Sequence, residues 1–150
     1  MNVFRFRGVL VGYATILLLS ACEGRERRDA QAFLALYESL DHRAPAAARE
    51  QKVSALKQLT LVDPKVKQAR DDCVSAHRAL LNAESQHEQA AKQLDQAIAK
   101  DFEGAPLPAS VGEPIRVAIE QADRSLADAR NRFLRCEEGA RSLSLRFGKR

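Results

Sequence analysis

Two long segments of this chain repeat small and apolar residues every seven positions, and this repeat restricts the fold more than any other feature. Paired lines with this period form the seam of a coiled coil. We therefore predict two long helices, at residues 64–101 and 113–147, joined by a loop with two prolines and two glycines. The first segment carries Val66, Cys73, Leu80, His87, Leu94 and Ala69, Ala76, Ala83, Ala90, Ala97; the second carries Ile115, Ala122, Ala129, Cys136, Leu143 and Ile119, Leu126, Phe133, Ala140, Phe147.

The N-terminal segment has the order of residues typical of an export signal. Arg5 and Arg7 precede a short apolar run, and small residues follow it. The residues Leu19-Ser20-Ala21-Cys22 resemble the lipobox of bacterial lipoproteins at all four positions. The resemblance implies that Cys22 carries lipid such as palmitate and becomes the first residue of the mature protein. It also implies a signal peptide at 1–21, a lipidated tether at 22–29 and a helical domain at 30–150.

An ordinary signal peptide is the alternative interpretation of this segment. A membrane-spanning helix would require about 20 apolar residues. The charges that begin at Glu23 end the apolar run before that length. In enterobacterial lipoproteins, an Asp directly after the acylated Cys tends to retain the protein at the inner membrane. The Glu at this position therefore implies a lipid anchor at the outer membrane, on its periplasmic face.

Cys73 and Cys136 are the two cysteines left after Cys22. An even pair in an oxidising compartment predicts a disulfide. In an antiparallel hairpin this bridge sets the register, because facing residues then have numbers with a constant sum. The same register places Ala76 opposite Phe133 and most other small residues opposite large ones, as a packed core requires.

Shorter helices are expected before the hairpin. Asp29 can cap a first helix, which ends near Asp41, and a second helix covers about residues 45–61. Asp63-Pro64 is a start signal for the long helix that follows. We predict an all-α fold, in which the two shorter helices and the antiparallel hairpin form a three- or four-helix bundle. An outer groove formed with Phe33, Tyr37, Leu56 and Leu59 is a candidate site for a partner's helix.

The boundaries of the last helix also have candidate signals. Ser110 and Glu113 have the spacing of a capping box, whereas Pro114 can instead mark the first turn. Gly148 is a plausible stop.

Motifs that carry chemistry are scarce. Cys73 and His77 lie one helical turn apart, but two ligands are too few for a structural zinc site, so we predict no metal and no cofactor. No local motif suggests nucleophilic catalysis or a phosphate-binding loop, and we predict no enzymatic activity. Acids and bases alternate at the spacing of a solvated helix face. The pairs are Glu88/Lys92, Glu120/Arg124, Asp128/Arg132 and Glu137/Arg141.

The charge balance gives little support for a nucleic-acid partner. The chain has 24 Lys and Arg against 20 Asp and Glu, and two of the arginines lie in the predicted signal peptide. Arg25, Arg27 and Arg28 follow the predicted anchor, where each would add up to about 1 kcal/mol of attraction to anionic headgroups. Keeping the tether soluble explains these arginines equally well.

The predicted domain is similar in architecture to two kinds of lipoprotein. Some secretin pilotins are small helical lipoproteins that bind a secretin's tail in a groove, and the murein lipoprotein is a helical rod joined to peptidoglycan through a C-terminal Lys. This chain ends Lys149-Arg150. Architecture does not determine function. We therefore expect an adaptor or scaffold for an envelope protein, with a tether between membrane and peptidoglycan as the alternative. A hydrolase or binding protein for a cell-wall ligand is a third class.

Overall fold

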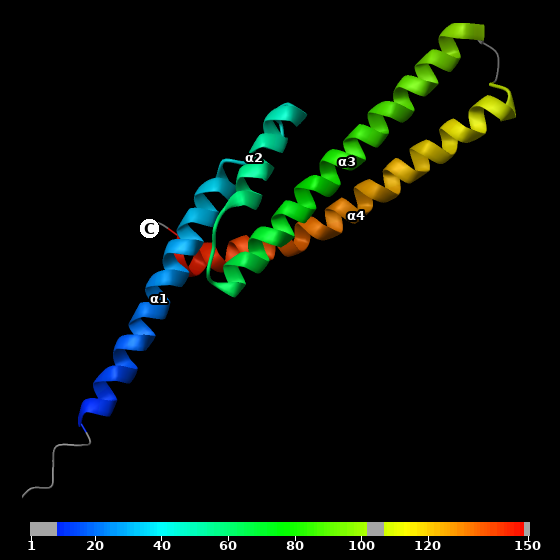
Figure 1. The fold of residues 1–150 in the computed structure, drawn as a ribbon. Coiled ribbons are helices and arrows are strands. Elements are labelled where there is room, and N and C mark those ends of the chain that lie inside the picture. The colour runs from blue at the N-terminus through cyan, green and yellow to red at the C-terminus, as the bar shows by residue number, and fades with distance from the viewer. Residues whose placement is uncertain (1–8, 102–106, 149–150) are drawn as a thin grey trace, which may run out of the picture.

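The computed structural model describes the backbone of residues 9–101 and 107–148, and the side chains of residues 24–99 and 107–148. The fold is all-α, as predicted. Within the described ranges four helices follow one another, α1 (Val9–Glu38), α2 (Ala46–Gln58), α3 (Pro64–Asp101) and α4 (Ala109–Phe147). Helices α3 and α4 form a long antiparallel hairpin, and the shorter helix α2 and part of α1 lie beside one half of it (Figure 1).

The hairpin has the register that the disulfide predicts. Cys73 and Cys136 are bonded, with 4.5 Å between their Cα atoms. Every residue of the predicted line from Ile115 to Leu143 is buried in α4. In α3 the buried part of the predicted alanine line is Ala69, Ala76, Ala83 and Ala90. His87 reaches solvent from its position in the seam.

Gly139 allows the two long helices to approach closely near the disulfide. It lies within α4 and faces Ala69 of α3. A Cβ atom added at this glycine would lie 3.1 Å from the Cβ of Ala69, which is tighter than nearly all contacts of this kind. The small residues of both helices therefore set the spacing of the seam, and the sequence pattern alone did not single out this glycine.

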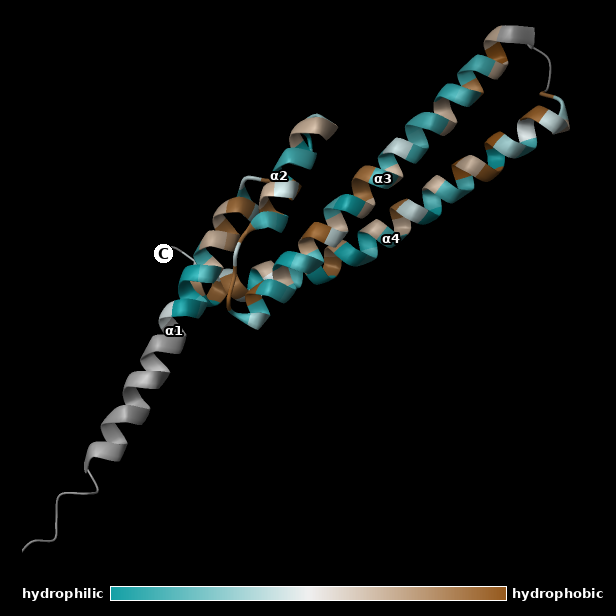
Figure 2. Ribbon diagram, in the orientation of Figure 1, coloured by the Kyte–Doolittle hydropathy of each residue, from teal (hydrophilic) through white to brown (hydrophobic). Residues whose placement is uncertain are grey.

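The main core lies where α1 and α2 meet the half of the hairpin that contains the disulfide. Figure 2 shows hydrophobic residues gathered where these helices meet, with hydrophilic residues facing outward. Phe33, Val53, Leu56 and Val66 are among the largest fully buried side chains. Beyond this region, α3 and α4 continue as a two-helix arm without α1 or α2 against it (Figure 1). The remaining buried members of the core are Ala30, Leu34, Leu61, Ala69, Cys73, Val74, Ala76, Cys136, Ala140 and Leu143.

Two of the predicted helix caps differ from the structure. Helix α1 is already helical at Val9, so Asp29 lies inside it rather than at its start. The Asp29 carboxylate instead accepts hydrogen bonds from the backbone N–H groups of Val62 and Asp63, at 2.6 and 2.7 Å. At the start of α4, Pro108 is the capping residue and no side chain supplies a capping bond, so the predicted Ser110 box is absent.

Other predicted boundaries are confirmed. Asp63 caps α3, since its carboxylate accepts the N–H groups of Lys65 and Val66 at 2.9 and 3.1 Å. Gly148 is the residue that follows the last turn of α4. The predicted second helix is slightly shorter than expected, because Leu59 is already extended. Within the described residues, none of the helices has the length and apolar character needed to cross a membrane.

Candidate functional site

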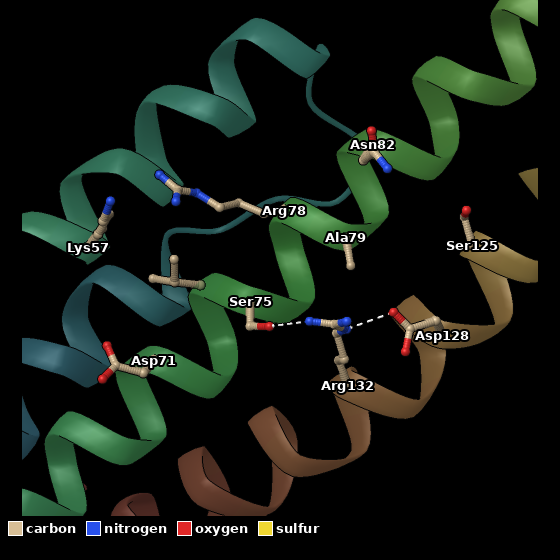
Figure 3. Close-up of a pocket in the computed structure, with 10 residues that line it drawn as sticks. Lys57, Asp71, Ser75, Arg78, Ala79, Asn82, Ser125, Asp128 and Arg132 are labelled. Atoms are coloured by element: carbon tan, nitrogen blue, oxygen red, sulfur yellow. Dashed lines mark hydrogen bonds and ion pairs between the residues drawn. The ribbon is translucent and has the colours of Figure 1, made fainter.

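An open groove lies between α2 and the two helices of the hairpin. Its volume is about 560 Å³. Figure 3 shows its side chains, which come from all three helices. Eight of the ten lining residues have charged or polar side chains, which include both cations and carboxylates, so the groove suits a polar ligand better than an apolar one. The lining residues are Lys57, Asp71, Val74, Ser75, Arg78, Ala79, Asn82, Ser125, Asp128 and Arg132.

Arg132 connects the two walls of this groove. Its guanidinium donates to the Ser75 hydroxyl of α3 at 2.8 Å and to the Asp128 carboxylate of α4, also at 2.8 Å (Figure 3). The lining also includes Lys57 from α2 and Arg78 from α3, and neither forms an ion pair within the described residues. Two of the three lining cations are therefore available to carboxylates of a ligand.

A pair of stacked histidines lies elsewhere on the hairpin. His42, in the connection between α1 and α2, stacks on His77 of α3 with 5.1 Å between ring centroids. Phe133 of α4 packs edge-on against both rings. His77 is only 4% exposed, and its Nε2 atom has no hydrogen-bond partner among the described residues. Burial, with the positive charges of His42 and Arg49 nearby, lowers the pKa of His77 to about 4.

The four residues predicted to form a partner groove are mostly part of the core. Phe33 and Leu56 have no exposed surface, and Leu59 packs against the same core. A partner cannot reach the two buried side chains in this conformation, so the predicted groove is wrong. Of these four residues, Tyr37 lines a hollow of about 360 Å³ between α1 and α4. Burial is the main cause that raises the pKa of Tyr37, and the negative charge of Glu137 raises it further.

The predicted ion pairs are only partly present. Lys92 bonds Glu88 and Arg132 bonds Asp128, as the spacing predicts. Glu120 pairs with Arg116 rather than with Arg124, whose side chain donates to a backbone carbonyl. Sequence spacing identified Asp128/Arg132 as a solvated pair, and it did not predict that Arg132 also reaches Ser75, 57 residues away.

The cysteines have separate outcomes. Cys73 is bonded to Cys136, so the pair formed by Cys73 and His77 has no free thiolate to offer a metal. Within the described part of the chain, no three His, Cys, Asp or Glu side chains are arranged to hold a metal ion. The side chain of Cys22 lies outside the described residues, as do those of the signal-peptide segment.

Comparison of this chain with protein-family models, with curated proteins and with solved structures finds no match.

Proposed function

We propose that this protein is a lipid-anchored lipoprotein of the periplasmic face of the outer membrane, and that it acts as a non-enzymatic adaptor for an envelope protein. The anchor is Cys22, at the end of the lipobox-like sequence. The disulfide between Cys73 and Cys136 is in keeping with an oxidising compartment outside the cytoplasm. These two features support the location.

The groove between α2 and the hairpin is the observation that carries the adaptor role. It opens along three helices, and its available cations are Lys57 and Arg78. Hydroxyl and amide groups of Ser75, Ser125 and Asn82 add further hydrogen-bonding positions. An acidic, polar segment of a partner protein matches this lining, because its carboxylates would meet the cations and its backbone the neutral polar groups.

The anchor is tested by detergent phase separation of envelope protein. The unaltered chain is expected in the detergent phase and in fractions that contain outer-membrane markers, whereas Cys22→Ala should remain as unprocessed precursor. An unaltered chain in the aqueous phase would refute the lipid anchor. Recovery with inner-membrane markers would refute the location inferred from Glu23.

The adaptor role is tested by site-specific photo-cross-linking from Asn82 in the full chain, in intact envelopes. We expect a stoichiometric protein adduct that decreases when Arg78 is changed to Glu. The matched control is Lys92→Glu, a charge reversal at an exposed position of α3 that is not part of the groove lining, which should leave the adduct unchanged. An adduct that is insensitive to Arg78→Glu would exclude the groove as the binding site.

A tether between membrane and peptidoglycan is the second candidate, and the length of the hairpin favours it. Helix α3 has 38 residues. At 1.5 Å per residue it is about 57 Å long, which suits a spacer. Co-sedimentation of the protein with purified murein, without a protein adduct from the groove, would favour this candidate. Failure of both assays would return attention to a cell-wall hydrolase or ligand-binding protein.

A further inference from the structure

Three segments of the chain meet at the end of the helical domain opposite the hairpin tip, and only the N-terminal part of α1 continues beyond them (Figure 1). They are residues 24–29 of α1, residues 62–67 at the start of α3 and residues 141–148 at the end of α4 (Figure 1). Arg146 of the third segment donates to Glu26 of the first at 2.8 Å, and the carboxylate of Asp29 accepts the N–H of Val62 at 2.6 Å. We call these three segments together the basal end.

The basal end is strongly basic. It carries seven cations against three carboxylates, a net of four positive charges. All of the cations other than Arg146 lack an ion pair within the described residues. The seven cations are Arg25, Arg27, Arg28, Lys65, Lys67, Arg141 and Arg146.

The three carboxylates of the basal end are already engaged. The Glu26 carboxylate accepts hydrogen bonds from the guanidinium of Arg146. The Asp29 carboxylate accepts hydrogen bonds from backbone N–H groups of the segment before α3. The Asp63 carboxylate accepts hydrogen bonds from N–H groups in the first turn of α3. Their negative charges are thus directed toward the protein itself, and the unpaired cations are left to dominate the field outside it.

Two large apolar side chains are exposed among these cations. Leu145 is 83% exposed and lies one helical turn after the unpaired Arg141, while Val62 is 59% exposed and lies three residues before the unpaired Lys65. Exposed apolar groups surrounded by unpaired basic residues are the combination that binds the interface of a bilayer with anionic lipids.

The hairpin tip has the opposite charge. Residues 86–99 and 107–124 carry three cations and five carboxylates. The charge therefore changes sign along the long axis of the molecule. An anionic surface would attract the basal end and repel the tip, and this difference gives the molecule a preferred orientation on such a surface.

We propose that the basal end is a membrane-contacting surface for anionic lipid headgroups, which holds the hairpin upright with its tip pointing away from the bilayer. The surface does not include the proposed anchor residue Cys22, and its residues come from the tether segment, the start of α3 and the end of α4. It extends the proposed function, since a lipid on Cys22 would attach the chain without determining how the rest of the protein stands on the membrane.

The absence of tryptophan from the chain allows a direct test. Leu145→Trp places a fluorescent reporter at the basal end, and Val117→Trp places a matched one in the arm, where the native side chain is also exposed. The full chain is reconstituted into vesicles of phosphatidylcholine, with or without phosphatidylglycerol, and quenching by brominated lipid is measured. We expect a blue shift and quenching for Leu145→Trp in the anionic vesicles, and neither for Val117→Trp.

The charge dependence is tested on the Leu145→Trp background. Neutralising Arg25 and Lys65 with Gln should weaken the preference for anionic vesicles by about fivefold for each cation. Arg124→Gln, in the arm, is the control that should leave it unchanged. Salt at 1 M, where the screening length falls to about 3 Å, should abolish the preference.

The outcomes separate this surface from the anchor. Flotation of the protein with purely neutral vesicles reports attachment through the N-terminal segment, whatever the basal end does. Protein that floats while the reporter at Leu145 stays as solvent-exposed as the one at Val117 would overturn the proposed surface and leave the anchor intact. Equal quenching in neutral and anionic vesicles would overturn the role of charge.

Discussion

Acidification provides a test of the packing around His77. The His77 ring is buried between His42 and Phe133, and its pKa is lowered from 6.5 to about 4 in the folded protein. In the unfolded chain the same ring takes up a proton near the ordinary value. Acid therefore favours the unfolded state. The stability contributed by a neutral His77 is complete above pH 6.5 and is lost as the pH falls from 6.5 toward 4.

The size of this loss follows from the two pKa values. Each unit of difference is worth about 1.4 kcal/mol. Between about pH 7.5 and about pH 4.5 the linkage gives a loss of about 2 kcal/mol from His77 alone. Other groups titrate in the same range, so the measurement requires a variant that lacks only this ring.

His77→Leu is the variant that removes the titration and keeps an apolar side chain in the same place. Urea unfolding followed by circular dichroism at a series of pH values measures the stability of both proteins. We expect the native protein to lose about 2 kcal/mol more than His77→Leu on acidification. Parallel curves for the native protein and His77→Leu would refute the assignment of a neutral, buried His77.

Three further predictions concern the fold. Replacing Cys73 and Cys136 with Ala should lower the free energy of unfolding by up to about 4 kcal/mol in the chain-entropy treatment. Most of the helical circular dichroism signal should remain, and an unchanged midpoint of thermal unfolding would contradict this prediction. Ala76→Leu should destabilise by about 1–3 kcal/mol through overpacking, whereas Ala127→Leu at an exposed position should have little effect in the same assay. Asp29→Ala should cost about 1–3 kcal/mol in urea unfolding, because two backbone N–H groups lose their acceptor.

The hairpin was predictable because its information is repeated many times along the chain. A seven-residue period persists through both long helices, and Cys73 with Cys136 fixes their relative shift. Each heptad repeats the same packing requirement, so small local errors do not change the prediction. The start of α3 was predictable for a different reason, since the Asp63 cap and the proline after it act within one turn.

The N-terminal region was predicted less well because tertiary contacts override its local pattern. The charged residues from Glu23 to Asp29 were interpreted as a tether with a cap at its end. In the structure residues 24–29 are helical, and Glu26 and Asp29 bond partners that lie 120 and 33 residues away in the chain. A polar segment can thus remain helical when its side chains have distant partners, which no sequence window contains.

The candidate groove was missed for the same physical reason. Its central contact joins Ser75 to Arg132, which lie on different helices, and its rim depends on where α2 packs. The apolar pattern alone predicts a partner-binding role for hydrophobic residues of α1 and α2. Phe33 and Leu56 are instead fully buried in the core that joins the short helices to the hairpin, where they remove apolar surface from water.

The uneven cover of the hairpin has a consequence for how the molecule opens. The half that holds Cys73 and Cys136 is enclosed by α1 and α2, whereas the rest of α3 and α4 is held by one seam of mostly small side chains. Local opening costs least where the fewest apolar contacts must be broken. Amide hydrogens of the arm should therefore exchange through local fraying that begins at the tip, while those around the disulfide should exchange only when the whole domain unfolds.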